Sequence, residues 1–179
     1  MRQPGPPIGL VTARGRCNPL VASFMAFVGH TAVMLVLERR MRETSGPGII
    51  PFELAGNASR AEAIMDRWGS AGQRTARVSL WLDFGYMATY GTLTALLVDR
   101  TRRRRGDSAV LPAMVIVAVA GDAIEGISLL KVLNRTRVGV HARCAQIAAL
   151  IKFAVLVGAL GYVAVGRFGA SHAGDASSV

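Results

Sequence analysis

The residues best placed to do chemistry are ionisable side chains inside apolar stretches of the chain. Five such residues are His30, Asp83, Asp122, Glu125 and Lys152. A charged group at the centre of a membrane span costs at least about 2.5 kcal/mol, so these groups usually face the interior of a helix bundle and find partners there. The pattern therefore predicts a buried polar layer that could bind a ligand, a proton or a cation.

Spacing adds detail to this layer. Asp122 and Glu125 are three residues apart, which places both carboxylates on one side of a helix, and Lys152 is available to neutralise one of them. Because carboxylates outnumber the lysine, at least one must share a proton, be hydrated or shift its pKa. Asp83 and Tyr86 are also three residues apart. The predicted site residues are His30, Asp83, Tyr86, Asp122, Glu125 and Lys152, of which Asp83, Asp122 and Glu125 are also catalytic candidates.

Four long apolar runs must position these side chains, at about 20–37, 80–98, 109–130 and 144–165. A helix of about 20 apolar residues crosses a hydrocarbon core of about 30 Å. Backbone groups in lipid must be satisfied within the chain, and no alternating pattern of barrel strands is present. The predicted fold is all-α: an integral membrane four-helix bundle, with a short amphipathic surface helix between the first and second spans.

Depth in the membrane decides whether the ionisable residues can meet. If successive spans are antiparallel, all five lie about four to nine residues from the face that carries segment 39–79, or roughly 6 to 14 Å at about 1.5 Å per residue. They therefore share one layer. Small residues should let the helices pack closely there, at Gly85, Gly91, Gly121, Gly126, Gly158 and Gly161.

Segment 39–79 contains the predicted surface helix, at about 60–68. Ser59 and Glu62 have the spacing of a capping box, and Gly69 should end the helix. Its apolar residues lie on one face at positions 61, 64, 65 and 68, so the helix should lie along the membrane surface or cap the bundle. Binding of a partner protein is an alternative use of that face. After it, residues 73–77 run into the second span without a breaker.

The formal net charge of +10 and the sequence pI of about 11.1 raise the question of nucleic acid. The basic residues flank spans and no nucleic-acid motif accompanies them, so we expect contact with membrane lipid instead. The short, arginine-rich loop 99–108 favours a cytoplasmic location for that loop and both termini. Residues 1–18 and 169–179 are predicted to be disordered tails around a membrane domain at 19–168.

Several short motifs carry a resemblance to known sequences, which covers roughly residues 52 to 153. They are PFELAG at 51–56, WG at 68–69, LDF at 82–84, YG at 90–91, Asp122 with Glu125, and KF at 152–153. With these motifs the chain resembles a group of uncharacterised small four-span bacterial inner-membrane proteins. The resemblance implies a multi-pass protein of the bacterial plasma membrane with a repeated acidic pattern, and it implies no activity.

Several functions fit this pattern. The leading prediction is a noncatalytic bundle whose carboxylate and lysine layer binds a small or lipid-like ligand or organises a membrane complex. Alternatives are a membrane-embedded isomerase or hydrolase acting on a lipid-like substrate, and a proton-coupled transporter acting as a dimer. A network that only fixes helix packing also stays open. His30 alone predicts a hydrogen bond to a neighbouring helix, so no metal or cofactor is expected, and a homo-oligomer or larger membrane complex stays open.

Overall fold

The computed structural model describes the backbone of residues 18–175 and the side chains of residues 18–167. The predicted tails therefore lie largely outside the described residues. The described part is all-α, in agreement with the predicted class. Its elements, in chain order, are α1 (Pro19–Glu43), α2 (Ile49–Glu53), α3 (Ala58–Arg105), the short 3₁₀ helix η1 (Leu111–Ala113), α4 (Met114–Leu133) and α5 (Val138–Asp175). Helix α5 continues past position 168, where the bundle was predicted to end.

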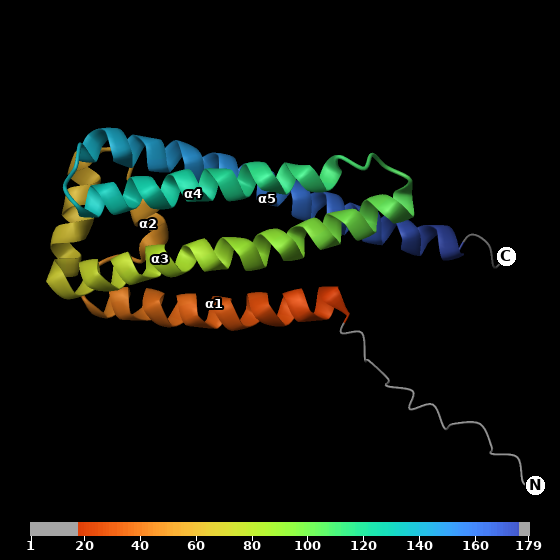
Figure 1. Ribbon diagram of the computed structural model, residues 1–179, viewed down its shortest axis with the longest axis horizontal. Helices are drawn as coiled ribbons and strands as arrows, with labels where there is room; N and C mark the ends of the chain where they lie inside the picture. Colours follow the sequence, from red (N-terminus) through yellow and green to blue (C-terminus); the bar gives the residue numbers. More distant parts are fainter. Residues whose placement is uncertain (1–17, 176–179) are drawn as a thin grey trace, which may run out of the picture.

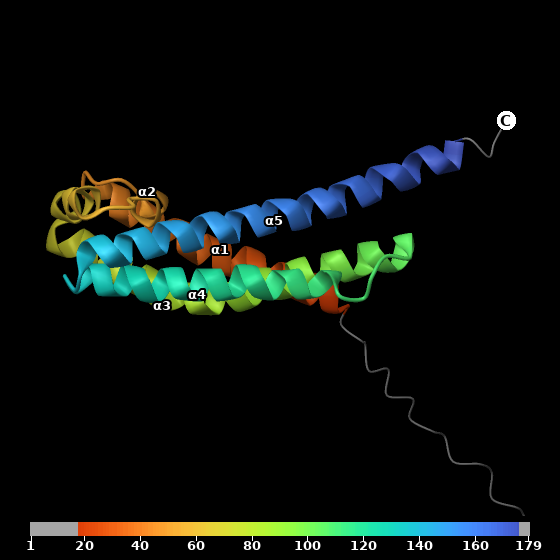
Figure 2. The same ribbon diagram turned by 90° about the horizontal axis from the view of Figure 1, so that it is seen from above.

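The long helices run side by side in one elongated bundle (Figure 1). Helix α3 lies in the middle, because it packs against α1 on one side and against α4 and α5 on the other. Helices α4 and α5 form a closely packed pair, and α5 projects beyond the bundle at its C-terminal end (Figure 2). The central position of α3 lets its side chains meet residues from all three of the other long helices.

Three of the described helices are long and apolar enough to cross a membrane: Pro19–Glu43, Leu111–Leu133 and Val138–Arg167. They contain the first and fourth predicted spans and nearly all of the third, which was predicted to begin two residues earlier, at 109. The second predicted span, 80–98, is helical but belongs to α3, which is not among the three. Large apolar side chains are exposed on these three helices, as at Met25, Ile116 and Val157. Such side chains are suited to contact with lipid tails.

Helix α3 has two arms that meet at Gly69. The backbone there has φ 58° and ψ −166°, a conformation that essentially only glycine adopts. The first arm, 58–69, crosses the end of the bundle, and the second arm runs unbroken to Arg105 along the bundle (Figure 1). The sequence therefore placed the end of the short helix correctly, and it also predicted the continuous helix through residues 73–77.

The predicted cap of that short helix was wrong by two residues. Asn57 is the N-cap, and its side chain accepts a hydrogen bond from the backbone N–H of Arg60 at 2.9 Å. The Ser59 hydroxyl donates to the Asn57 side chain instead of capping the helix itself. Asparagine is as good an N-cap as serine. Asn57 therefore starts the helix two residues earlier, and Ser59 lies within the first turn.

The apolar face of the first arm is buried as its spacing predicts. Ala61, Ile64, Met65 and Trp68 belong to one core cluster with residues of α1, α2, α4 and α5. This arm therefore covers one end of the bundle, the end near the ionisable residues. Its opposite face carries exposed Arg60, Asp66 and Arg67.

The glycines contribute unequally to helix packing. A side chain at Gly91 would meet Val119 at 2.9 Å, and one at Gly121 would meet the Ala148 carbonyl oxygen at 3.3 Å, so both allow close approach of neighbouring helices. At Gly158 and Gly161 nothing lies within 4 Å. The prediction of close packing was wrong at those two positions, because both glycines lie on the exposed face of α5, whereas Ala159 and Val163 are buried with Val98 of α3.

Candidate functional site

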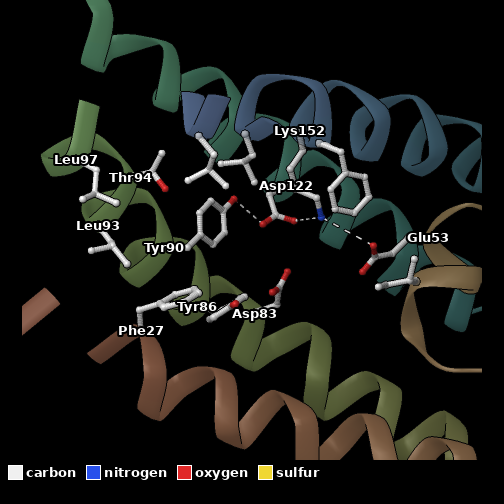
Figure 3. Close-up of a pocket in the computed structure, with 14 residues that line it drawn as sticks. Phe27, Glu53, Asp83, Tyr86, Tyr90, Leu93, Thr94, Leu97, Asp122 and Lys152 are labelled. Carbon is white, nitrogen blue, oxygen red and sulfur yellow. Dashed lines mark hydrogen bonds and ion pairs between the residues drawn. The ribbon is translucent and has the colours of Figure 1, made fainter. Parts of the chain in front are cut away.

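The centre of the site is the ammonium group of Lys152 on α5. Its Nζ lies 2.8 Å from Oδ1 of Asp122 and 2.7 Å from Oε2 of Glu125, both on α4. A third carboxylate, Glu53 of α2, places its Oε2 at 3.9 Å. Asp122 and Glu125 are each 2% exposed and Lys152 is 7% exposed. We call these four residues the ion cluster; it joins three segments that are far apart in sequence. Figure 3 labels three of its members, Glu53, Asp122 and Lys152.

Helices α4 and α5 approach closely beside this cluster because of Gly121. Its backbone lies against Ala148 and Lys152, where any larger residue would push the helices apart. Asp122 follows directly, so its carboxylate projects from the point of closest approach. A buried ion pair is stable only if short, well-aligned contacts offset the cost of removing both charges from water. The close packing of α4 and α5 at Gly121 allows such a short contact between Asp122 and Lys152.

Glu53 reaches the ion cluster because α2 is held from three sides. The Glu38 carboxylate on α1 accepts a hydrogen bond from the Ile49 N–H at 2.8 Å, at the start of α2. At the other end, the Gln146 side-chain amide on α5 donates to the Leu54 carbonyl at 3.2 Å. The Trp68 ring packs on Phe52 with centroids 4.9 Å apart. These contacts turn a five-residue helix into a fixed support for a buried carboxylate.

A cavity of about 530 Å³ opens beside the ion cluster. Its polar end is lined by Glu53, Asp83, Asp122 and Lys152, and the Tyr90 hydroxyl donates a 2.7 Å hydrogen bond to Oδ2 of Asp122. The Asp83 carboxyl points toward Asp122 from the opposite wall (Figure 3). The remaining lining is apolar or aromatic and comes from α1, α3 and α5. This volume lies in the range of small-molecule sites.

The six predicted site residues separate into three groups. Asp122, Glu125 and Lys152 are in direct contact, and Asp83 and Tyr86 line the adjoining cavity. His30 is set apart: its Nε2 lies 3.1 Å from the Leu82 carbonyl oxygen on α3, and its ring packs 5.5 Å from Tyr86. That contact is the interhelical hydrogen bond that a lone histidine in a bundle favours.

The predicted site set omits two residues of the site, Glu53 and Tyr90. The Tyr90 hydroxyl, like that of Tyr86, was expected to favour a cavity, and its spacing of seven residues from Asp83 and four from Tyr86 puts it on their face of the helix. Glu53 ends a helix too short to show any periodicity. Its only signal is a single acidic residue in the apolar stretch IIPFELA at 49–55.

Burial raises the pKa of the Glu53 carboxyl, and the Lys152 ammonium only partly opposes this rise. A group with a raised pKa in the folded state stabilises the fold below its unfolded pKa, about 4.3 for glutamate. That stability is lost as the pH increases toward the folded pKa.

The variant Glu53→Gln should therefore gain thermal stability relative to the wild type as the pH increases from about 4. The measurement is the unfolding temperature of the purified protein in detergent at a series of pH values. Glu43→Gln, at an exposed position on α1, is the matched control and should track the wild type throughout. If the unfolding temperature of Glu53→Gln fell relative to that of the wild type as the pH increased, the raised pKa of Glu53 would be contradicted.

Comparison of the chain with protein-family models, curated proteins and solved structures finds no match. Membership of the four-span bacterial group stays a prediction. The case for function therefore depends on the geometry of the ion cluster and its cavity.

Proposed function

We propose that this chain is a four-span protein of the bacterial inner membrane whose cavity binds a lipid-like ligand. The observation that supports it best is the cavity itself, which joins a buried ion cluster to an apolar channel between α1, α3 and α5. A cluster that served only helix packing would need no adjoining space. Polar groups at one end and apolar walls along the rest suit an amphipathic molecule.

The fourth span in this proposal is the second arm of α3, over about 80–98. It runs beside α1, α4 and α5 for their shared length (Figures 1 and 2). This arm is less apolar than the three candidate spans because of its central position. There, residues such as Asp83 and Tyr90 face protein and the cavity instead of lipid. The first arm of α3 would then lie at the membrane surface, and the arginine-rich loop after α3 would be cytoplasmic.

A cavity-filling variant tests ligand binding without disturbing the ion cluster. Leu156 lines the apolar part of the cavity, so Leu156→Trp should displace ligand that copurifies with the protein. Leu150 is on the same helix but 55% exposed, so Leu150→Trp is the matched control. Native mass spectrometry of both purified variants reports the bound species.

We expect the wild type and Leu150→Trp to retain the same lipid-like mass, and Leu156→Trp to lose most of it while keeping its helical circular dichroism. Asp122→Asn and Glu125→Gln should weaken retention as well. Equal retention in Leu156→Trp and the wild type would overturn the proposal and leave a purely structural ion cluster.

One observation favours an enzyme as the second candidate. The carboxyl groups of Asp83 and Asp122 and the Tyr90 hydroxyl line the same cavity, which places groups that can donate and accept a proton beside a bound molecule. An isomerase or hydrolase acting on the same lipid-like ligand would need this arrangement. Incubation with a lipid extract should then generate new species with the wild type and none with Asp83→Asn, as detected by mass spectrometry.

A further inference from the structure

The polar end of the cavity has more carboxyl groups than ammonium groups. Glu53, Asp83 and Asp122 line it and Glu125 contacts Lys152 beside it, whereas Lys152 carries the one ammonium group among the described lining residues. That ammonium is already engaged, because it contacts Asp122 and Glu125 at 2.8 and 2.7 Å. An anionic head group entering the cavity would therefore meet carboxylates and no available cation.

Asp83 differs from the other carboxylates of this group. It forms no ion pair with any side chain that the structure describes, whereas Glu53, Asp122 and Glu125 each have Lys152 within 4 Å. Its carboxyl lies on the α3 wall of the cavity and points across it (Figure 3). A cation placed beside Asp83 and Asp122 would give Asp83 an ion-pair partner.

Aromatic rings line the same cavity. Phe27, Tyr86, Tyr90 and Phe153 all line it, and Tyr86 packs against Phe27 and Tyr90 with centroid distances of 5.7 and 5.6 Å. Organic cations are attracted to the faces of such rings within about 6 Å. The chain already contains one such contact, since the Lys152 Nζ lies 4.8 Å from the Phe153 centroid.

The apolar lining of the cavity extends over a length suited to an alkyl chain. On α3 the lining residues continue from Asp83 to Leu97, fourteen positions or about 21 Å at 1.5 Å per residue. On α5 the lining ends at Leu160, which is also 52% exposed on the outer surface. The apolar end therefore reaches the surface that faces lipid, which gives an alkyl chain a route of entry.

We infer that the ligand is a single-chain amphiphile with an organic ammonium head, held between Asp83, Asp122 and the aromatic rings, with its alkyl tail along α3 and α5. This inference rests on the proposed ligand-binding function and adds the charge of the head group to it. Charge complementarity selects this occupant over a neutral or an anionic amphiphile, because only a cation offsets the excess carboxylates.

Three probes of equal chain length test the inference: an alkyl trimethylammonium, an alkyl alcohol and an alkyl sulfonate. Each is titrated by calorimetry into the purified wild type in a nonionic detergent near neutral pH. We expect the ammonium probe to bind at least about tenfold more tightly than the other two, which corresponds to about 1.4 kcal/mol. Asp83→Asn should remove that preference and leave the affinity for the alcohol unchanged.

Asp83→Asn is suited to this test because it breaks no ion pair among the described side chains. Asp66→Asn, at a site with a side chain 70% exposed, is the matched control and should keep the ammonium preference. If all three probes bind equally, the cavity function stands and the ammonium head is refuted. Preference for the sulfonate would also refute it, with Lys152 as the head-group partner. Binding of none of the probes would overturn both the inference and the proposed function.

Discussion

Lys152→Met is expected to cause the largest loss of stability of any single substitution in the ion cluster. Methionine keeps most of the length of the side chain but removes the one ammonium group, so Asp122, Glu125 and Glu53 lose their common partner. Breaking a buried ion pair from one side costs about 3–5 kcal/mol, because the remaining charge is left buried without compensation. Thermal unfolding in detergent should show a large drop in midpoint or a loss of folded protein.

The matched control for this variant is Lys131→Met. Lys131 is the chain's other lysine, lies at the end of α4 and is exposed, so its replacement should change stability little. The triple variant Lys152→Met, Asp122→Asn, Glu125→Gln should recover part of the lost stability, because it removes charge from both sides. If Lys152→Met unfolds at the wild-type temperature, the ion cluster is not a stabilising element.

Trp68→Ala is expected to have the second largest effect. Trp68 is 1% exposed, packs on Phe52, and donates a hydrogen bond from Nε1 to the Pro47 carbonyl at 2.5 Å. Removing a buried tryptophan costs about 3–5 kcal/mol through lost transfer energy and the cavity that remains. Because Phe52 is followed directly by Glu53, the same change should loosen the carboxylate from the ion cluster. Chemical denaturation should therefore give a markedly lower free energy of unfolding.

The other tryptophan provides the control. Trp81 is 63% exposed on the outer face of α3, and Trp81→Ala should leave the free energy of unfolding close to that of the wild type. Comparable losses in the two variants would mean that α2 is not supported by the ring of Trp68, against the packing described above.

The main features of the site could be predicted because membrane depth and helical spacing restrict which side chains can meet. Counting residues from one membrane face placed Asp122, Glu125 and Lys152 at one level, and the structure brings these three into contact. Helical spacing also identified the buried face that contains Met65 and Trp68. Both predictions depend only on regular helix geometry, which can be inferred from the periodicity of a sequence.

The missed features depend on tertiary contacts. Glu53 enters the site through α2, a helix that is formed by contacts with Glu38, Trp68 and Gln146 and not by its own periodicity. The cap at Asn57 was missed because neighbouring residues compete for the same role. Close packing failed at Gly158 because that glycine lies on the exposed face of α5, and the exposed face depends on how the whole helix packs.

The order of residues along the chain has a consequence for biosynthesis. Every carboxylate of the site precedes the only ammonium, since Glu53, Asp83, Asp122 and Glu125 are all translated before Lys152. In the proposed topology, a nascent chain ending before α5 would hold its acidic groups in lipid with no counter-ion, at a cost of at least about 2.5 kcal/mol for each group near the centre. The last helix would then complete the assembly, and a chain truncated ahead of it would be a natural target for the proteases that remove unfinished membrane proteins.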